Sequence, residues 1–234
     1  MPIAGIIGGI GPESTIDYYR RIIATYRRRR PDGTYPPIIV NSIDLSEAVK
    51  LVESQQYDRL THLLRDELDR LKRAGAEFAV LAANTPHLVF DQLSKVTSLP
   101  LISIVEATCN AVKLSGVTKV GLFGTRFTMA NDFYYRPFHR EGISLVVPGD
   151  DEQALIHERY MGELVNGVFK NETKQELLTI AARMHNHDRI QGLILGGTEL
   201  PLILRDVDEL RIPLFDTAQI HVDSIVDRLL AGQS

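Results

Sequence analysis

The sequence predicts an α/β protein made of two similar halves, each built on a parallel sheet. Short runs rich in Ile, Val and Leu alternate with longer segments of helical periodicity, a pattern typical of βαβ units. The chain also repeats itself, and a glycine turn follows the matching strand in both copies. Since no low-complexity stretch or Ser/Pro-rich linker divides the chain, we expect the halves to be closely packed.

The expected strands are the short apolar runs, and helices fill most of the gaps between them. The clearest helix covers residues 57–74, where leucines recur on one stripe and Gly75 is placed to end it. The strands cover residues 3–8, 38–43, 78–82, 101–104, 120–123, 144–147, 192–195 and 214–215.

The internal repeat defines the two halves. With an offset of 116 residues, three landmarks fall on identical residues: Gly5, Gly8 and Tyr18 on Gly121, Gly124 and Tyr134. A weaker match aligns residues 80–85 with 194–199. We therefore predict one half from residues 1–115 with 211–234, and the other from 116–210. Because ligands bind at the carboxyl ends of parallel strands, the site is expected in the cleft between the halves.

Composition excludes several classes of protein. Lys plus Arg number 26 against 30 for Asp plus Glu, so no global field attracts nucleic acid or an anionic membrane. The single cysteine, Cys109, cannot form an intramolecular disulfide, and neither a signal peptide nor a membrane-spanning apolar run is found. We expect a cytoplasmic protein with no nucleic-acid or membrane partner.

Two further motifs have simple structural interpretations. The basic run at residues 27–30 ends the first predicted helix, where cations favour the helix dipole and solvent. His185 and His187 lie in a loop-like segment and lack further ligands at recognisable spacing. We therefore expect no metal.

Three strand-to-helix junctions carry glycines and small polar residues. They cover residues 8–15, 83–87 and 197–200, and Thr125 and Thr128 add two hydroxyls at another helix start. Free amides and hydroxyls at such junctions can hold a carboxylate, although Thr also serves as a helix cap without any ligand. The first junction departs from the G-x-G-x-x-G spacing of dinucleotide-binding proteins. The pattern suits a small carboxylic acid.

These junctions, together with residues 41–44 and 124–129, resemble the signature regions of the cofactor-independent aspartate/glutamate racemase family over nearly the whole chain. The resemblance implies two pseudo-symmetric, flavodoxin-like α/β halves with the site in the cleft between them. It also implies a small carboxylate or amino-acid ligand, no cofactor and a homodimer.

The two positions that carry thiols in two-cysteine members of the family are different here. In those racemases one thiol removes the proton from the substrate Cα, and the opposite thiol supplies another on the other face. Ala83 and Gly197 stand at these positions, and neither side chain can exchange a proton. Cys109 follows a different strand and is expected to be a small buried residue. Ordinary two-base racemisation through these positions is therefore excluded.

The remaining candidates for proton transfer are His87 and Glu199. A packing role for His87, and stabilisation of Glu199 by a helix dipole, stay open as alternatives. The residues expected to bind the ligand are Gly9, Ser42, Asn84, Thr85, Thr125, Thr128 and Thr198.

Three interpretations of function stay open. The favoured one is an enzyme that acts on a small amino acid or related carboxylate by isomerase or lyase chemistry without the two-cysteine relay. The second is a catalytically silent carboxylate-binding or amino-acid-binding homologue. The third is an engineered cysteine-less variant of an amino-acid racemase.

Overall fold

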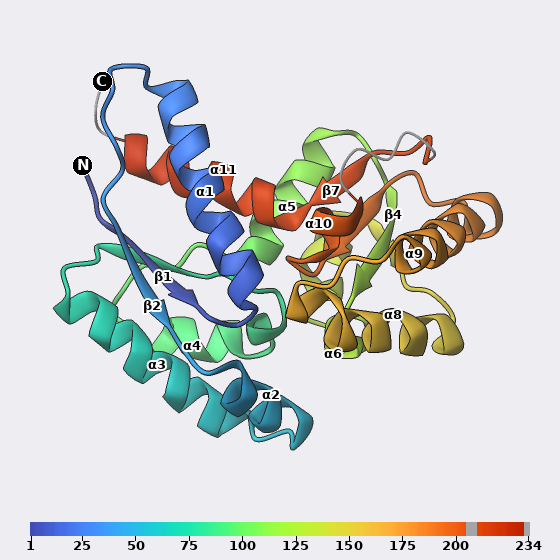
Figure 1. Cartoon of the computed structure of the whole chain (residues 1–234), viewed down its shortest axis with the longest axis horizontal. Helices are drawn as coiled ribbons and strands as arrows, with labels where there is room; N and C mark the ends of the chain where they lie inside the picture. Colours follow the sequence, from blue (N-terminus) through green and yellow to red (C-terminus); the bar gives the residue numbers. More distant parts are fainter. Residues whose placement is uncertain (205–209, 232–234) are drawn as a thin grey trace. The chain divides into compact units, whose positions relative to one another are not determined.

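The computed structural model describes residues 1–204 and 210–231. The chain divides into two compact units, Met1–Ile104 with the chain from His221 onward, and Val105–Ile220. Each unit holds one sheet in which all paired strands are parallel, with helices packed on it (Figure 1). The prediction of an α/β fold with parallel sheets is confirmed.

The sheet of the first unit has the order β2-β1-β3, so that β1 is central and fully buried. An isolated parallel bridge between Ala79 and Leu101 extends the β3 edge. The three strands are β1 (Ala4–Gly8), β2 (Ile38–Ser42) and β3 (Phe78–Leu81).

Helices cover both faces of this sheet. Figure 1 shows α1 and α11 along one face and α3 and α4 along the other. Leu60, Leu64, Leu68 and Leu71 are fully buried on one side of α3, which confirms the predicted leucine stripe. The helical segments are α1 (Pro12–Arg29), α2 (Leu45–Glu53), α3 (Tyr57–Arg73), the 3₁₀ turn η1 (Thr85–Val89), α4 (Phe90–Val96) and α11 (Thr217–Leu230).

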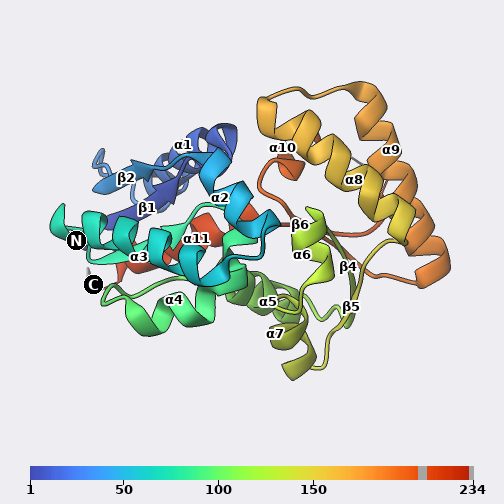
Figure 2. The same cartoon turned by 90° about the horizontal axis from the view of Figure 1, so that it is seen from below.

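The second unit repeats this plan with the strand order β5-β4-β6-β7. Its strands are β4 (Lys119–Gly124), β5 (Ser144–Val146), β6 (Leu193–Gly196) and β7 (Leu214–Asp216). Figure 2 shows α8 and α9 on one face of this sheet and α5 and α7 on the other. The helical segments are α5 (Ile104–Leu114), α6 (Arg126–Ala130), α7 (Tyr135–Arg140), α8 (Asp150–Gly162), η2 (Leu164–Asn166), α9 (Asn171–Arg183), the π-helical turn η3 (Met184–Asp188) and α10 (Leu200–Leu204).

The repeated tyrosines occupy equivalent places in the two units. Tyr18 on α1 and Tyr134 just before α7 are both fully buried. The Tyr18 hydroxyl contacts Nδ1 of His221 on α11 at 3.0 Å. Tyr134 forms a side-chain hydrogen bond with Thr108 on α5. Tyr18 therefore anchors α11, which follows β7 of the second sheet along the chain. Tyr134 anchors α5, which follows the Leu101 bridge of the first sheet.

This anchoring reflects an exchange of helices along the chain. After its first residue, α5 belongs to the second unit, although it follows the Leu101 bridge of the first sheet. Conversely, α11 follows β7 of the second sheet and belongs to the first unit from His221 onward. Within the described chain, each unit thus contains one helix that follows, in sequence, the last strand of the other unit's sheet.

Two local expectations were wrong. Residues 101–104 form only the bridge at Leu101, because the Ile104 N–H already donates to the His87 ring at 3.3 Å and α5 begins there. The segment with His185 and His187 is a π-helical turn that continues α9. There the His185 ring contacts the carbonyl of Ile190 at 2.9 Å.

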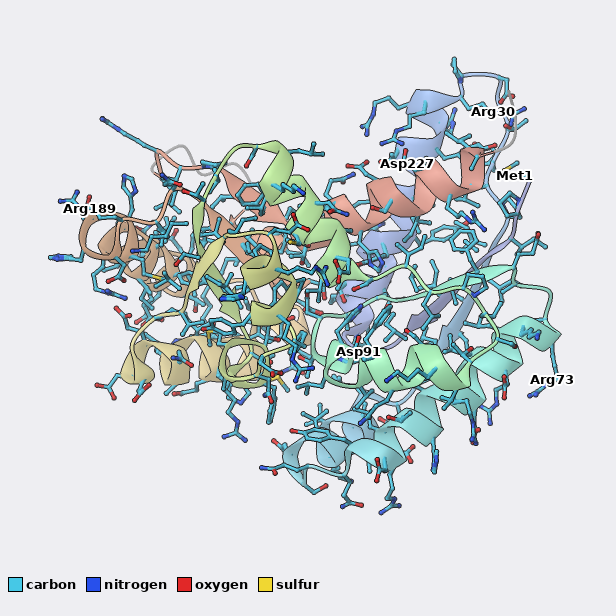
Figure 3. The ribbon with its side chains drawn as sticks, turned by 180° about the vertical axis from the view of Figure 1, so that it is seen from behind. Met1, Arg30, Arg73, Asp91, Arg189 and Asp227 are labelled. Carbon is cyan, nitrogen blue, oxygen red and sulfur yellow. The ribbon has the colours of Figure 1, made fainter. Side chains whose placement is uncertain are left out.

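The basic run ends α1 as predicted. Arg29 pairs with Asp223 and Asp227 of α11, and Arg27 lies over the ring of Tyr35. Figure 3 labels Arg30, the last residue of the run, and Asp227. The charged groups of these two ion pairs are partly solvent-exposed, so each pair contributes about 0–1 kcal/mol to stability. Among the helices described here, none is long and apolar enough to cross a membrane.

Candidate functional site

In the first unit the site begins with the glycine turn after β1. Gly9 has φ +81°, and a Cβ there would lie 2.3 Å from the Ile43 carbonyl oxygen and 2.7 Å from the Ser42 hydroxyl. The Gly9 N–H donates to the Thr15 hydroxyl at 2.9 Å, which closes the turn into α1. Glycine is required here because the ends of β1 and β2 approach so closely. Gly9 and Ser42 are therefore neighbours, and Ser42 is exposed.

The end of β3 carries the next group of predicted site residues. The Ala82 N–H donates to the Ile7 carbonyl at 2.9 Å, which aligns the β3 end with the β1 end. Ala83 and Asn84 follow and are buried, whereas Thr85, which begins η1, is half-buried. Asn84 and Thr85 thus lie at the carboxyl edge of the sheet, as the junction pattern predicted.

His87 is held by two backbone groups. Its Nε2 accepts the Ile104 N–H at 3.3 Å, so Nδ1 carries the ring proton and donates to the Ala83 carbonyl at 3.1 Å. Burial, with the neighbouring His221 as the second cause, lowers the pKa of His87 to about 3. The ring also stacks on Phe90. A neutral ring with both nitrogens engaged fixes the chain after β3 and the start of α5.

In the second unit, Thr125 and Thr128 form the N-terminal cap of α6. The Thr128 N–H donates to the Thr125 hydroxyl at 3.3 Å, and the two hydroxyl oxygens are 3.2 Å apart. The capping alternative is therefore present in the structure. The Thr128 methyl also stands 3.3 Å from where a Cβ of Gly196 would be, so this pair lies beside the end of β6.

Glu199 follows the end of β6 and is 1% exposed. Its Oε2 accepts two hydroxyl hydrogen bonds, one from Tyr160 and one from Thr198 at 3.1 Å. A buried carboxylate needs such donors because it has lost its water shell. Glu199 and Thr198, both predicted from sequence, thus share one hydrogen-bonded cluster.

Tyr160 is the member of this cluster that the sequence analysis missed. It comes from α8 and is 6% exposed. Burial, followed by the charge of Glu199, raises the pKa of the Tyr160 hydroxyl well above its ordinary value. The phenol is therefore protonated at neutral pH and donates to the carboxylate. Nothing in the local sequence marks Tyr160, because its role depends on contact with a strand end remote in sequence.

Gly197 explains why Tyr160 fits there. A Cβ at Gly197 would lie 2.4 Å from Cε2 of the Tyr160 ring and 2.9 Å from its hydroxyl oxygen. A side chain at 197 would therefore require the Tyr160 ring to move, and with glycine there the phenol takes the space in which a Cβ would stand.

Cys109 lies on α5, outside these two groups of residues. Its side chain is buried, as expected, and burial followed by Glu106 and Glu141 raises the pKa of the thiol to about 11. Cys109 is therefore a neutral thiol at physiological pH. Among the described residues, no group of three or more His, Cys, Asp and Glu side chains is placed to hold a metal ion.

The predicted site residues thus fall into two groups, one in each unit. The first contains Gly9, Ser42, Ala83, Asn84, Thr85 and His87, and the second contains Thr125, Thr128, Gly197, Thr198 and Glu199. Every member lies at or just beyond the carboxyl end of a strand or in the turn that follows it. Such edges are the places where parallel α/β sheets bind ligands.

Comparison with known proteins agrees with this architecture. The chain matches the family model described as Asp/Glu/Hydantoin racemase over residues 7–225. It is 23% identical, over 98% of its length and 99% of the relative, to a broad-specificity amino-acid racemase from Bacillus subtilis strain 168.

Two crystal structures extend the likeness to three dimensions. A candidate Asp/Glu racemase from Yersinia pestis is 32% identical with a TM-score of 0.88, covering 98% of this chain and all of that one. An aspartate racemase homologue from Pyrococcus horikoshii is 36% identical with a TM-score of 0.83, covering 98% and 99% of the two chains. The family match spans both sheets and nearly all of the strand-end residues, and we conclude that the chain belongs to the Asp/Glu/hydantoin racemase family.

Proposed function

We propose that this protein is an enzyme of isomerase or lyase type that acts on a small amino acid or related carboxylate. The observation that supports it is the buried Glu199 carboxylate, held by the hydroxyls of Tyr160 and Thr198 at the end of β6. The Glu199 carboxylate can accept and return a proton, whereas the side chains of Ala83 and Gly197 cannot. A positioned group of this kind accelerates proton transfer by roughly 10²- to 10⁴-fold.

The ligand carboxylate is proposed to bind at the strand ends through hydroxyls, amides and backbone N–H groups. In the first unit these residues are Ser42, Asn84 and Thr85, with Gly9 shaping the turn because its N–H already donates to Thr15. In the second unit they are Thr125, Thr128 and Thr198. Their position at the carboxyl edges of parallel sheets supports this assignment. The name of the Bacillus subtilis relative supports an amino acid as the substrate class.

Of the two predicted proton-transfer groups, we assign the step to Glu199. His87 is the weaker candidate because each ring nitrogen already bonds a backbone group and burial keeps the ring neutral. In this proposal His87 is a positioning residue for the segment after β3.

The test is proton NMR of the purified protein in D₂O with a panel of L- and D-amino acids and related dicarboxylates. We expect loss of the Cα proton signal, or a new product, for at least one compound. Glu199→Gln should slow that reaction by about 100-fold or more. Glu163→Gln is the matched control, because Glu163 is also a buried glutamate that accepts a threonine hydroxyl, from Thr173. Wild-type protein that leaves every compound unchanged would contradict the proposal.

A second candidate function is a binding protein that has lost the reaction. The engaged ring of His87, together with Ala83 and Gly197 at the two strand ends, favours it. This candidate predicts saturable line broadening of one panel compound with neither deuterium incorporation nor product.

A homodimer, which the family resemblance implies, and the cytoplasmic location expected from the sequence remain proposals. Light scattering on the purified chain should give twice the mass of one chain, and a single-chain mass would contradict the dimer.

A further inference from the structure

The space beside Gly197 is filled by a functional group from another element. The Tyr160 ring and hydroxyl stand 2.4 Å and 2.9 Å from where a Cβ of residue 197 would be. A side chain at 197 would therefore displace the phenol at 160 from its present position. Since a phenol can exchange a proton through its oxygen, the strand end keeps an ionisable group although residue 197 is glycine.

Tyr160 is fixed at this strand end by packing. It belongs to α8, which packs on β4, and it shares a hydrophobic cluster with Phe123 and Leu195 of the two neighbouring strands. The ring is thus supported by regular elements on both sides. A reacting group must be held to within a fraction of an ångström, and such packing provides that precision.

The hydrogen bond of the Tyr160 hydroxyl provides a path along which its proton can move to Glu199. Tyr160 donates to Oε2 of Glu199, and Thr198 donates to the same oxygen at 3.1 Å. The Thr198 side chain and the Glu199 backbone N–H also hydrogen-bond to the phenol oxygen, so a proton arriving from another molecule must displace one of these donors. Because burial and the adjacent negative charge oppose tyrosinate formation, a proton gained by the phenol must be balanced by one passed to Glu199.

From these contacts we infer that Tyr160 is the catalytic residue of the second unit and that Glu199 acts through it. This inference rests on the proposed function. In the forward step the substrate Cα–H bond breaks and its electron pair stays on the substrate. The released proton forms a new O–H bond at the phenol while the original phenol proton moves to Oε2 of Glu199. The phenol stays neutral, Glu199 becomes a carboxylic acid, and the negative charge moves to the substrate.

The reverse sequence protonates a carbanion. Glu199 returns its proton to the phenol oxygen as the phenol proton passes to Cα. The same pair thus returns a proton to the carbanion that its own removal of the Cα proton has formed, which is the step that deuterium incorporation detects.

Tyr160→Phe tests the assignment because it removes the hydroxyl alone. We expect kcat to fall by about 100-fold or more with KM nearly unchanged, in whichever panel reaction the wild-type protein performs. Tyr134→Phe is the matched control, since Tyr134 is an equally buried tyrosine of the same unit whose hydroxyl bonds Thr108 instead of a carboxylate. It should keep kcat within a few-fold.

A second measurement guards against a folding defect in Tyr160→Phe. Site-specific 3,5-difluorotyrosine at position 160 keeps the shape and the hydrogen bond but lowers the pKa of the phenol. If the phenol exchanges the proton, kcat and its pH profile shift, whereas difluorotyrosine at position 134 leaves both unchanged. A purely structural hydroxyl at position 160 predicts no shift in either variant.

The outcomes separate the two proposals. Wild-type activity that survives in Tyr160→Phe, or a pH profile that ignores the fluorinated residue, overturns the role of Tyr160 and leaves the proposed function standing. Wild-type protein without exchange or product on the whole panel overturns the proposed function, and the role of Tyr160 falls with it.

Discussion

Individual contacts at glycines determine which residues the strand ends accept. Gly9 and Gly142 both have positive φ, at +81° and +71°, but their surroundings differ. A Cβ added at Gly9 would lie 2.3 Å from the Ile43 carbonyl oxygen. A Cβ added at Gly142 would have no neighbouring atom within 4 Å. The pair separates the cost of a left-handed backbone from the cost of crowding.

Alanine substitutions make that separation measurable. Gly142→Ala should lower the free energy of unfolding by about 1–2 kcal/mol, the cost of placing a Cβ in left-handed backbone. Gly9→Ala should lose roughly 1–3 kcal/mol more, because a backbone carbonyl cannot move aside. Urea denaturation of both variants gives the comparison. Equal losses would show that the ends of β1 and β2 can separate enough to admit a methyl group at residue 9.

The steric conflict between a side chain at 197 and the Tyr160 ring predicts an energetic coupling. Gly197→Ala should lower the free energy of unfolding by about 1–3 kcal/mol, because its methyl group meets the Tyr160 ring. In a Tyr160→Ala background the same change should cost little, since the ring is gone. A double-mutant cycle by urea denaturation measures this difference. Additive losses would contradict the close packing of the two residues.

At the scale of elements, two histidines connect segments distant in the chain. His221, on α11, accepts the Tyr18 hydroxyl of α1 at Nδ1 and donates from Nε2 to the Ile102 carbonyl at 3.0 Å. His87 binds the backbone of Ile104, two residues further on. The segment before α5 is therefore held at both ends by buried, neutral imidazoles.

These imidazoles make stability depend on pH. Burial lowers the pKa of His221 to about 4 and that of His87 to about 3, whereas the unfolded value is 6.5. The unfolded chain takes up protons first as pH falls, so their contribution is fully present above pH 6.5 and is lost progressively down to the folded pKa values. At pH 5.5 the unfolding free energy should be lower than at pH 7.5 by about 1.4 kcal/mol per histidine.

Urea denaturation at the two pH values tests this expectation. His221→Gln should be less stable at both values but should show a pH difference smaller by about 1.4 kcal/mol. The exposed His62→Gln is the control and should keep the full difference. A His221 variant with an unchanged pH difference would contradict a neutral, buried His221.

The same contacts explain where prediction of elements succeeded and failed. Strand positions followed from apolar runs, and α3 followed from its leucine stripe, because these patterns record burial within one element. The strand predicted at residues 101–104 was wrong because the His87 side chain, which lies outside this segment, accepts the N–H of Ile104. A pattern confined to one segment carries no information about a distant hydrogen-bond partner.

At the scale of the whole molecule, the internal repeat predicted two parallel sheets but placed residues 214–215 with the first half, whereas β7 pairs with β6 of the second sheet. Gly5 and Gly121 mark central strands with the same flanking order, and each is followed by a glycine turn and a helix. The junction motifs likewise identified residues that lie at strand ends. Tyr160 escaped prediction because it enters its cluster from α8 and has no counterpart in the repeat. The roles assigned to the site residues remain predictions for the experiments above.

The exchange of α5 and α11 has a consequence for the order in which the protein forms on the ribosome. The second unit is continuous in sequence and can assemble as soon as Val105–Ile220 has emerged. The first unit must wait for its final helix, whose buried face includes Val222, Ile225, Val226 and Leu229. The portion synthesised first is therefore completed last, and until the segment from His221 onward has been synthesised, its nascent core lacks the apolar face of α11.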